Sequence, residues 1–502
     1  MRPQKRNREM RTPPRAAPPP STLAALGRGC RPYVLASLLL LAPCFWLPRV
    51  QAGDLSSHIY NAWLAQLIAS GRAPGLQVVR QTTNVLFDLM LSGLFRPLGA
   101  AAAQRISVSL AVLTFVWGAF AFVSAVAGRR SWHVLPCIAM LAYGWVFHMG
   151  FFNFYLSLGL CFWALALVWK GEPRRAAAAV PVFLLAYAAH ALPVAWAAAL
   201  LGYLWLARRV SARRRAHLIL AMLAAMVLLH VAVGRILAAR WSLQQITMTT
   251  GADQVWVFDA KYYPVLIGLL LCWGLLFLRL VRFSGARQVV SDIPFQFCVL
   301  SAAGVFILPS TVQIPGYHHA LVYIADRMSL GVGICVCALL AAARPHALER
   351  YAPLVVALVF FGFLYRDERA LNSFEDRMQE AVAGLPPGRR VLSAIDDPDL
   401  RVNALAHVID RVCLGRCYSY ANYEPSTAQF RVRALAENPF VVSTYQDSWL
   451  MQVGAYVVKE RDLPLYQVDL DAAGRMTIKN LKAGVPCGST YWKALPDLLP
   501  GS

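Results

Sequence analysis

Residues 32–48 of the chain read PYVLASLLLLAPCFWLP, and the polar stretch GDLSSHIYNAWLAQLIASGRAP follows at residues 53–74. The first stretch is apolar along its length and approaches the roughly 20 residues that a helix needs to cross a bilayer. Similar runs recur up to residue 365. In lipid, an apolar segment of this kind can satisfy its backbone hydrogen bonds only as a helix. We therefore predict a polytopic α-helical membrane protein with about eleven transmembrane helices. The predicted spans lie near 32–48, 105–128, 132–150, 153–169, 176–190, 193–207, 215–237, 262–282, 294–309, 319–343 and 351–365.

The composition agrees with this class of protein. Of the 502 residues, 58% are hydrophobic and 15% are charged, and the mean hydropathy is +0.49. A soluble globular protein carries about 25% charged residues. The composition therefore excludes a soluble enzyme of ordinary type.

The positive charge lies in the membrane part and sets its orientation. Residues 1–365 hold 32 Lys and Arg against 9 Asp and Glu, whereas residues 366–502 hold 16 against 17. Most of the Lys and Arg fall in alternate loops, and such loops face the cytoplasm. We predict a protein of the cytoplasmic (inner) membrane with a cytoplasmic N-terminus and an extracytoplasmic C-terminus. The basic loops are expected to contact membrane lipid and not nucleic acid, which would need the charge on one soluble face.

Three parts follow from these patterns. Residues 1–31 are basic and Pro-rich, as in a disordered cytoplasmic tail. Residues 32–365 form the transmembrane domain, with a first outer loop at 51–104, and residues 366–502 a small C-terminal α/β soluble domain outside the membrane. In this last part RRVLSAIDDP, PFVVSTY, AYVVKE, PLYQVDLD and RMTIKNL are predicted strands, and DLRVNALAHVIDRVC is a predicted helix. An alternative for the N-terminus is a cleaved leader, because VQA before Gly53 resembles a signal-peptidase site.

Asp54 opens a predicted amphipathic helix along the membrane surface. Asp54 and His58 lie four residues apart and share one helix face. One interpretation is an N-cap, a role that Asp often fills. The other is the acid of an active site, since a reaction in the outer leaflet needs a base or a metal ligand there. The outer Asp and Glu of the membrane part are few: Asp54, Asp88, Asp253, Asp259 and Asp326.

A second candidate group lies at PSTVQIPGYHHALVYIADRMSL, residues 309–330. His318 and His319 stand at the outer mouth of a predicted span, and Asp326 and Arg327 lie inside it. Ionisable residues within a span are costly and are usually paired or functional. One interpretation is that Asp326 and Arg327 form bonds across neighbouring helices. The other is that Arg327 binds a lipid phosphate, because its guanidinium can donate two parallel N–H bonds to phosphate oxygens.

Two weaker signals lie in the C-terminal part. Its polar segments contain three cysteines, Cys413, Cys417 and Cys487. Two of them could form a disulfide if this part lies outside the cytoplasm. The stretch YSYANYEPSTAQFRVRA, residues 418–434, is polar and aromatic enough to contact sugar. The chain has no P-loop, GxSxG, HExxH or GxGxxG signature.

This layout resembles the GT-C superfamily of integral membrane glycosyltransferases. In that superfamily an acidic residue stands in the first outer loop just after the first span, and a soluble domain often follows the last span. Asp54 in GDLSSHIYNAWLAQLIASGRAP occupies that position, and the stretch is similar to bacterial members with a GD…H…A…G…P run.

The resemblance implies inverting transfer of a sugar from a polyprenyl-phosphate donor to an envelope acceptor at the outer face of the membrane. Asp54 would deprotonate or orient the acceptor hydroxyl, directly or through a divalent metal such as Mg²⁺ or Mn²⁺. The lipid phosphate would be held by His58, His318, His319 and Arg327, with Asp88, Asp253, Asp259 and Asp326 as accessory acids. Many members carry an Asp-Glu or Asp-x-Asp pair here, whereas Leu55 follows Asp54, so the metal is left open.

Two other classes of function remain. One is a transporter or flippase for lipid-linked or envelope precursors, which would favour internal repeats and broken helices. The other is a non-catalytic membrane scaffold whose outer domain binds partners. A site that contains both Asp54 and Arg327 would favour the enzyme.

Overall fold

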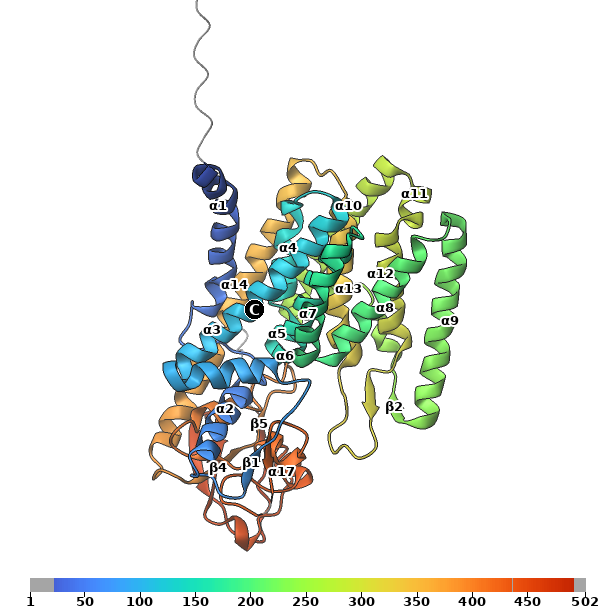
Figure 1. The fold of residues 1–502 in the computed structure, drawn as a ribbon. Coiled ribbons are helices and arrows are strands. Elements are labelled where there is room, and N and C mark those ends of the chain that lie inside the picture. The colour runs from blue at the N-terminus through green and yellow to red at the C-terminus, as the bar shows by residue number, and fades with distance from the viewer. Residues whose placement is uncertain (1–21, 436, 492–502) are drawn as a thin grey trace, which may run out of the picture.

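The structure is a computed structural model that describes residues 22–435 and 437–491. Figure 1 shows helices packed side by side, with the start of α1 at one end and most of the strands gathered at the other. The helices up to residue 383 are α1 (Thr22–Leu41), α2 (Leu55–Ala69), α3 (Leu86–Ala127), α4 (Leu135–Ala142), α5 (Trp145–Met149), α6 (Phe152–Val168), α7 (Pro173–Ala189), α8 (Ala191–Ala207), α9 (Ala212–Ile236), α10 (Tyr263–Ser284), α11 (Ala286–Ser291), α12 (Ile293–Ile307), α13 (Ile324–Leu340) and α14 (Ala347–Ala383).

The apolar helices indicate a membrane protein, as predicted. Among the described residues, five helical stretches are long and apolar enough to cross a membrane, by length and composition: 86–127, 132–149, 212–236, 260–284 and 347–383. Shorter apolar helices accompany them, and a helix lies at every predicted span. The helical class is therefore confirmed, and the count of about eleven spans stays a prediction.

The boundaries differ from the prediction at the N-terminus. Helix α1 begins at Thr22, inside the predicted tail, and residues 1–21 of that tail lie outside the described residues. Helix α3 joins the segment around Asp88, which lies in the predicted first outer loop, to the predicted span at 105–128. The two arms meet at Gly99, whose φ of 76° and ψ of 171° are not helical. The arms run in different directions (Figure 1).

Helix α2 is not an interfacial helix. Most of its residues are buried, on all sides of the helix, and they include the polar Ser57 and Asn61. Its surroundings are α3 on one side and the C-terminal region on the other. The predicted amphipathic helix would expose one apolar face to lipid, and a helix that is buried on all sides has no such face.

Arginines of the basic loops bond to carbonyl oxygens at helix ends. Arg129 donates to the oxygen of Ala341 (3.1 Å), just after α13, and Arg215 donates to the oxygen of Ala207 (2.8 Å), the last residue of α8. The last carbonyls of a helix lack partners within it. These arginines therefore have a structural role besides their charge.

The C-terminal region, residues 384–491, forms a mixed sheet with short helices. The four-stranded sheet has the order β6-β4-β8-β9, with β4 parallel to β6 and β8 and with β8–β9 as an antiparallel hairpin. Its elements are β4 (Arg390–Ser393), β5 (Ile395–Asp396), α15 (Val408–Val412), β6 (Tyr418–Ser419), α16 (Tyr423–Thr427), β7 (Val432–Ala434), α17 (Tyr445–Gln452), β8 (Leu465–Leu470), β9 (Met476–Asn480) and β10 (Thr490–Tyr491).

The predicted elements of this region are confirmed in part. RRVLSAIDDP gives β4 and β5, and PLYQVDLD with RMTIKNL gives the β8–β9 hairpin. PFVVSTY is not a strand, AYVVKE makes only the single bridge Val457–Pro486, and the helix predicted in DLRVNALAHVIDRVC is limited to α15.

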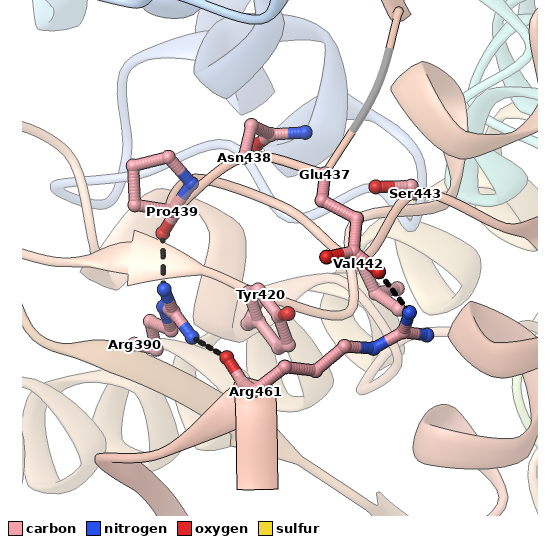
Figure 2. A pocket seen from close by; sticks show the side chains of 8 residues that line it. All are labelled: Arg390, Tyr420, Glu437, Asn438, Pro439, Val442, Ser443 and Arg461. Carbon is pink, nitrogen blue, oxygen red and sulfur yellow. Dashed lines mark hydrogen bonds and ion pairs between the residues drawn. The ribbon is translucent and has the colours of Figure 1, made fainter. Parts of the chain in front are cut away.

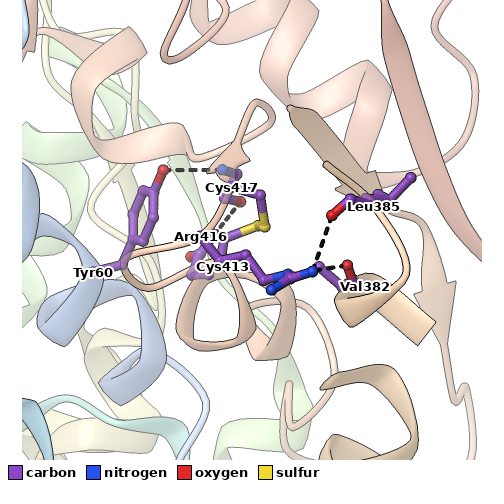
Figure 3. Close-up of a disulfide and its surroundings, with 8 residues drawn as sticks. Tyr60, Val382, Leu385, Cys413, Arg416 and Cys417 are labelled. Atoms are coloured by element: carbon purple, nitrogen blue, oxygen red, sulfur yellow. Dashed lines mark hydrogen bonds between the residues drawn. A yellow bond between two sulfur atoms is a disulfide. The ribbon is translucent and has the colours of Figure 1, made fainter. Parts of the chain in front are cut away.

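The C-terminal region is joined to the first outer loop. Strand β1 (Leu76–Val78) pairs antiparallel with β7, and the backbone N–H of Ser419 donates to the hydroxyl of Tyr60 (2.9 Å). A disulfide links Cys413 and Cys417, whereas Cys487 is a free, buried thiol. Figure 3 shows the disulfide next to Arg416, which donates to the oxygen of Leu385 (3.0 Å) and so fixes the chain after α14.

Candidate functional site

Asp54 stands at the N-cap position of α2 without acting as a cap. Its side chain makes no capping hydrogen bond. Instead Oδ1 lies 3.7 Å from Nε2 of His407, and the side chain is 19% exposed. The carboxylate therefore faces a site and not the helix end, which disfavours the purely structural interpretation of this residue.

The backbone of Asp54 is fixed by close packing of two glycines. The N–H of Gly53 donates to the oxygen of His148 (2.7 Å), and that of Asp54 donates to the oxygen of Met149 (3.0 Å). A Cβ on Gly150, whose φ is +85°, would lie 2.5 Å from the backbone nitrogen of Asp54. A Cβ on Gly53 would lie 2.7 Å from the oxygen of Asn403. Only glycine fits these two positions without moving the chain.

Replacing Gly150 with alanine is expected to displace Asp54 and to lower the rate of the predicted sugar transfer about 10²-fold, since small misplacements of reacting groups have that effect. Gly128 is a matched control, because its φ is also positive (+67°) but nothing lies within 4 Å of its Cβ position. Gly128→Ala should lower the melting temperature without lowering the turnover rate. Equal rates in the two variants would contradict the proposed link between this contact and the site.

His58 lies between two carboxylates. Its Nδ1 is 2.7 Å from Oδ1 of Asp88 in α3 and 4.0 Å from Oε1 of Glu424 in α16. Burial alone would lower the pKa of His58, but the carboxylates of Asp88, Glu424 and Asp54 together outweigh burial, and the pKa rises to about 10. The imidazole is therefore a cation at neutral pH.

Asp88 is held by neighbours from the membrane part. Oδ2 accepts a hydrogen bond from the side-chain amide of Asn153 (2.8 Å), and Oδ1 of Asn153 accepts from the backbone N–H of Phe87 (2.8 Å). The structure thus brings the predicted accessory acid Asp88 into the same group as Asp54 and His58.

The C-terminal region supplies three further members that the sequence analysis did not single out: His407, Tyr423 and Glu424. Burial lowers the pKa of His407, but the neighbouring carboxylate of Asp410, whose Oδ2 lies 3.3 Å from Nδ1 of His407, outweighs burial and the pKa rises. The ring of Tyr423 lies 5.2 Å from that of His407 and 6.0 Å from that of His319. Tyr423 therefore connects the Asp54 side of the site with the loop before α13.

Arg327 belongs to this group and has no ionic partner among the described residues. Its guanidinium lies 3.8 Å from the ring centre of Phe151, and Nε is buried without a hydrogen-bond partner. Asp54 is the negative charge that acts most strongly on it. Arg327 is not paired with Asp326, whose Oδ2 accepts from the hydroxyl of Ser310 (3.3 Å).

The two histidines of the loop before α13 differ in place. The ring of His319 contacts the rings of Tyr423 and Tyr445. His318 is exposed and makes no ring contact or ion pair with any residue that the structure describes. Of the predicted pair, only His319 lies in the group.

Asp253 and Asp259 have other partners. Oδ2 of Asp253 lies 3.5 Å from Arg401, and burial raises the pKa of this carboxyl to about 6. Asp259 caps the short helix after it by accepting from the N–H of Lys261 (2.9 Å). Neither carboxylate makes an ion pair with the Asp54 group, so the prediction of accessory roles for them gains no support from the geometry.

The residues around Asp54 do not fit a divalent cation. Within the described ranges 22–435 and 437–491, no group of three or more His, Cys, Asp or Glu is arranged to hold a metal ion. Mg²⁺ prefers several oxygen ligands. Here the two oxygens of Asp88 are already bonded to His58 and Asn153 and are not free to bind a cation.

A pocket of about 260 Å³ lies in the C-terminal region, apart from this group. Figure 2 shows Arg390 and Arg461 on its two sides, with Tyr420 between them. Arg390 donates to the backbone oxygens of Pro439 and Arg461, and Arg461 pairs with Glu437. None of the lining residues belongs to the Asp54 group.

A signal for the missed residues was present in the sequence. Tyr423 and Glu424 lie inside YSYANYEPSTAQFRVRA, the stretch predicted to contact sugar, but nothing in it pointed to Asp54. Compared with protein-family models, curated proteins and solved structures, the chain has no match.

Proposed function

We propose that the chain is a GT-C-like membrane glycosyltransferase, which moves a sugar from a polyprenyl-phosphate donor to an envelope acceptor on the outer face of the cytoplasmic membrane. The observation that carries this proposal is the pairing of functions in one group: an acid that does not cap its helix, Asp54, and an arginine without an ionic partner among the described residues, Arg327. A transfer from a phosphate needs both a group for the acceptor and a cation for the leaving phosphate.

The proposed orientation places this site outside the cytoplasm. The disulfide Cys413–Cys417 supports it, because disulfides persist in oxidising compartments. The excess of Lys and Arg in the loops at the opposite end supports it as well. About eleven spans would then separate the cytoplasmic N-terminus from the C-terminal region.

The residues suggest an inverting displacement. The acceptor hydroxyl binds at Asp54, which orients or deprotonates it, and its oxygen attacks the anomeric carbon. The bond from that carbon to the phosphate oxygen breaks, and the electron pair stays on the phosphate. Arg327 stabilises the departing charge, which a guanidinium does well through paired N–H donors.

Arg327→Gln tests this function. The purified protein in lipid nanodiscs is given a panel of radiolabelled polyprenyl-phosphate monosaccharides with an envelope extract as acceptor, and the release of polyprenyl phosphate is measured. The variant should lose about 10- to 10²-fold in kcat/KM, because hydrogen bonds to charged groups contribute about 1.5–3 kcal/mol. The exposed Arg240 provides the control Arg240→Gln, which should behave as wild type. Unchanged transfer in Arg327→Gln, or no transfer by the wild type from any donor of the panel, would rule out the assignment.

A further inference from the structure

Glu424 is a buried carboxylate with one oxygen fixed and the other free. It lies at the start of α16, where its N–H donates to Oδ1 of Asn422 (3.1 Å), and only 4% of the residue is exposed. Oε1 accepts a hydrogen bond from the hydroxyl of Ser57 (3.2 Å) and lies 4.0 Å from Nδ1 of His58. Oε2 has no hydrogen-bond partner among the described residues.

No Lys or Arg of the described chain lies within ion-pair distance of Glu424. Its cationic neighbour is His58, which is closer to Asp88 (2.7 Å) than to Glu424. A buried carboxylate without a matched cation favours its protonated form. Glu424 is in this respect unlike Glu375, which is also buried but pairs with Arg411 at 2.6 Å.

The charged and titratable groups that act on Glu424 come from three parts of the chain. Helix α2 and its N-cap provide His58 and Asp54, α3 provides Asp88, and His407 stands directly before α15. Beyond its neighbour Tyr423 lie Asp410 and Arg327, which act on that ring. Burial, with the charges of Asp88 and Asp54 added, raises the pKa of Glu424 to about 7 although His58 opposes the rise.

The geometry points to Glu424 as a second catalytic residue of the Asp54 site: it is the base that receives the proton of the acceptor hydroxyl. This inference rests on the proposed glycosyl transfer. The O–H bond of the acceptor breaks and its proton goes to Oε2 of Glu424, while the oxygen forms the new bond to the anomeric carbon. The anomeric bond to the phosphate breaks with its electron pair on the phosphate, next to Arg327. In this mechanism the role of Asp54 is to orient the acceptor hydroxyl for the attack. After the transfer, the proton on Glu424 is lost to solvent.

A base is most effective when its pKa lies near the working pH. Glu424 meets this condition through burial, and Ser57 fixes the carboxylate without neutralising it. The C-terminal region is thus part of the catalytic site, because α2 supplies the orienting acid and α16 supplies the base.

Glu424→Gln tests this role through the pH dependence of the rate. Glutamine retains an oxygen for the Ser57 hydroxyl but cannot take a proton. In the wild type, kcat/KM should rise with pH through a value near 7, the range to which burial raises the pKa of Glu424. In the variant the rate should fall about 10²-fold and this pH-dependent rise should disappear.

The matched control is Glu437→Gln, because Glu437 lies in the same region but is exposed and pairs with Arg461. It should keep the rate and the pH profile of the wild type. If Glu424→Gln retains the rise near pH 7 while Asp54→Asn is inactive, Glu424 is not the base, although the proposed function stands. If Asp54→Asn is fully active, the proposed function itself fails.

A measurement independent of transfer keeps the inference testable if Glu424→Gln folds poorly. Infrared difference spectra of the intact wild-type protein between acidic and alkaline pH should contain a carboxylic-acid band that titrates near neutrality. The conservative variant Glu424→Asp should shift the pH at which this band titrates. Asp253, whose pKa burial raises to about 6, is expected to contribute a component that remains in every Glu424 variant. A band that loses no component in Glu424→Gln, or that is unchanged in Glu424→Asp, would overturn the assignment.

Discussion

Asp54→Asn should lower the rate of sugar transfer by about 10²-fold or more, because Asp54 orients the acceptor hydroxyl and a misplaced reacting group costs about that factor. The free energy of unfolding should stay within about 0.5 kcal/mol of the wild type, as for surface changes that remove no structural contact. The reason is geometric: the carboxylate makes no capping hydrogen bond, and its nearest partner is His407 at 3.7 Å. Transfer assays and denaturant unfolding of the same preparations measure the two effects.

Asp259 provides the contrast, because its carboxylate does cap a helix by accepting from the N–H of Lys261. Asp259→Ala should cost about 1 kcal/mol of stability, as the loss of an N-cap does, and should leave transfer unchanged. The opposite pattern, with Asp54→Asn unstable but active, would make Asp54 a structural residue and would remove the basis of the proposed function.

The helical architecture could be predicted because its signal is local. An apolar run of sufficient length specifies a helix in lipid whatever its neighbours are, so every predicted span contains a helix. The β8–β9 hairpin was equally accessible, since two alternating segments flank Ala-Ala-Gly. Asp54 was singled out for its place after the first span.

The rest of the site depends on contacts between distant parts of the chain. Ser57 and Asn61 lie on the helix that was predicted to be amphipathic, but in the structure Ser57 bonds to Glu424 and Asn61 to Asn422. Nothing near Glu424 in the sequence indicates that its carboxylate will lie beside His58.

The helix predicted in DLRVNALAHVIDRVC failed for a similar reason. Arg401 donates to the backbone oxygens of Asp253 (2.6 Å) and Trp256 (2.7 Å), and its own N–H bonds to the oxygen of Phe258 (2.7 Å). These contacts hold residues near 401 in an irregular conformation. Tertiary bonds of this kind override a weak local preference.

Substitutions that break the buried ion pair between Glu375 and Arg411 should cause the largest loss of stability. Nε and Nη2 of Arg411 bond to the two carboxylate oxygens of Glu375 at 2.7 and 2.6 Å, and both residues are buried. Removal of one member of a buried pair leaves an unpaired charge and costs about 3–5 kcal/mol. Glu375→Leu leaves the buried Arg411 without a carboxylate and should lower the free energy of unfolding by that amount. The loss in Arg411→Met should be smaller, because Nε of Arg49 lies 3.3 Å from Oε2 of Glu375 and still compensates its charge. The exposed pair Arg175–Glu172 provides the control, since Arg175→Met should change the free energy of unfolding little.

The double variant Arg411→Met with Glu375→Leu distinguishes the effect of the buried charges on stability from the effect of Arg411 on the position of Asp54. Because it removes the buried Arg411 charge together with its carboxylate, it should recover much of the stability lost in Glu375→Leu. It should not recover the rate of transfer, because Arg411 also donates to the oxygen of Val50 (2.9 Å) and to Oε1 of Gln51 (3.2 Å), directly before Asp54. A double variant as unstable as Glu375→Leu alone would contradict the charge-burial argument. A double variant with full activity would show that the position of Asp54 does not depend on this contact, and would leave Gly150 as the feature that fixes it.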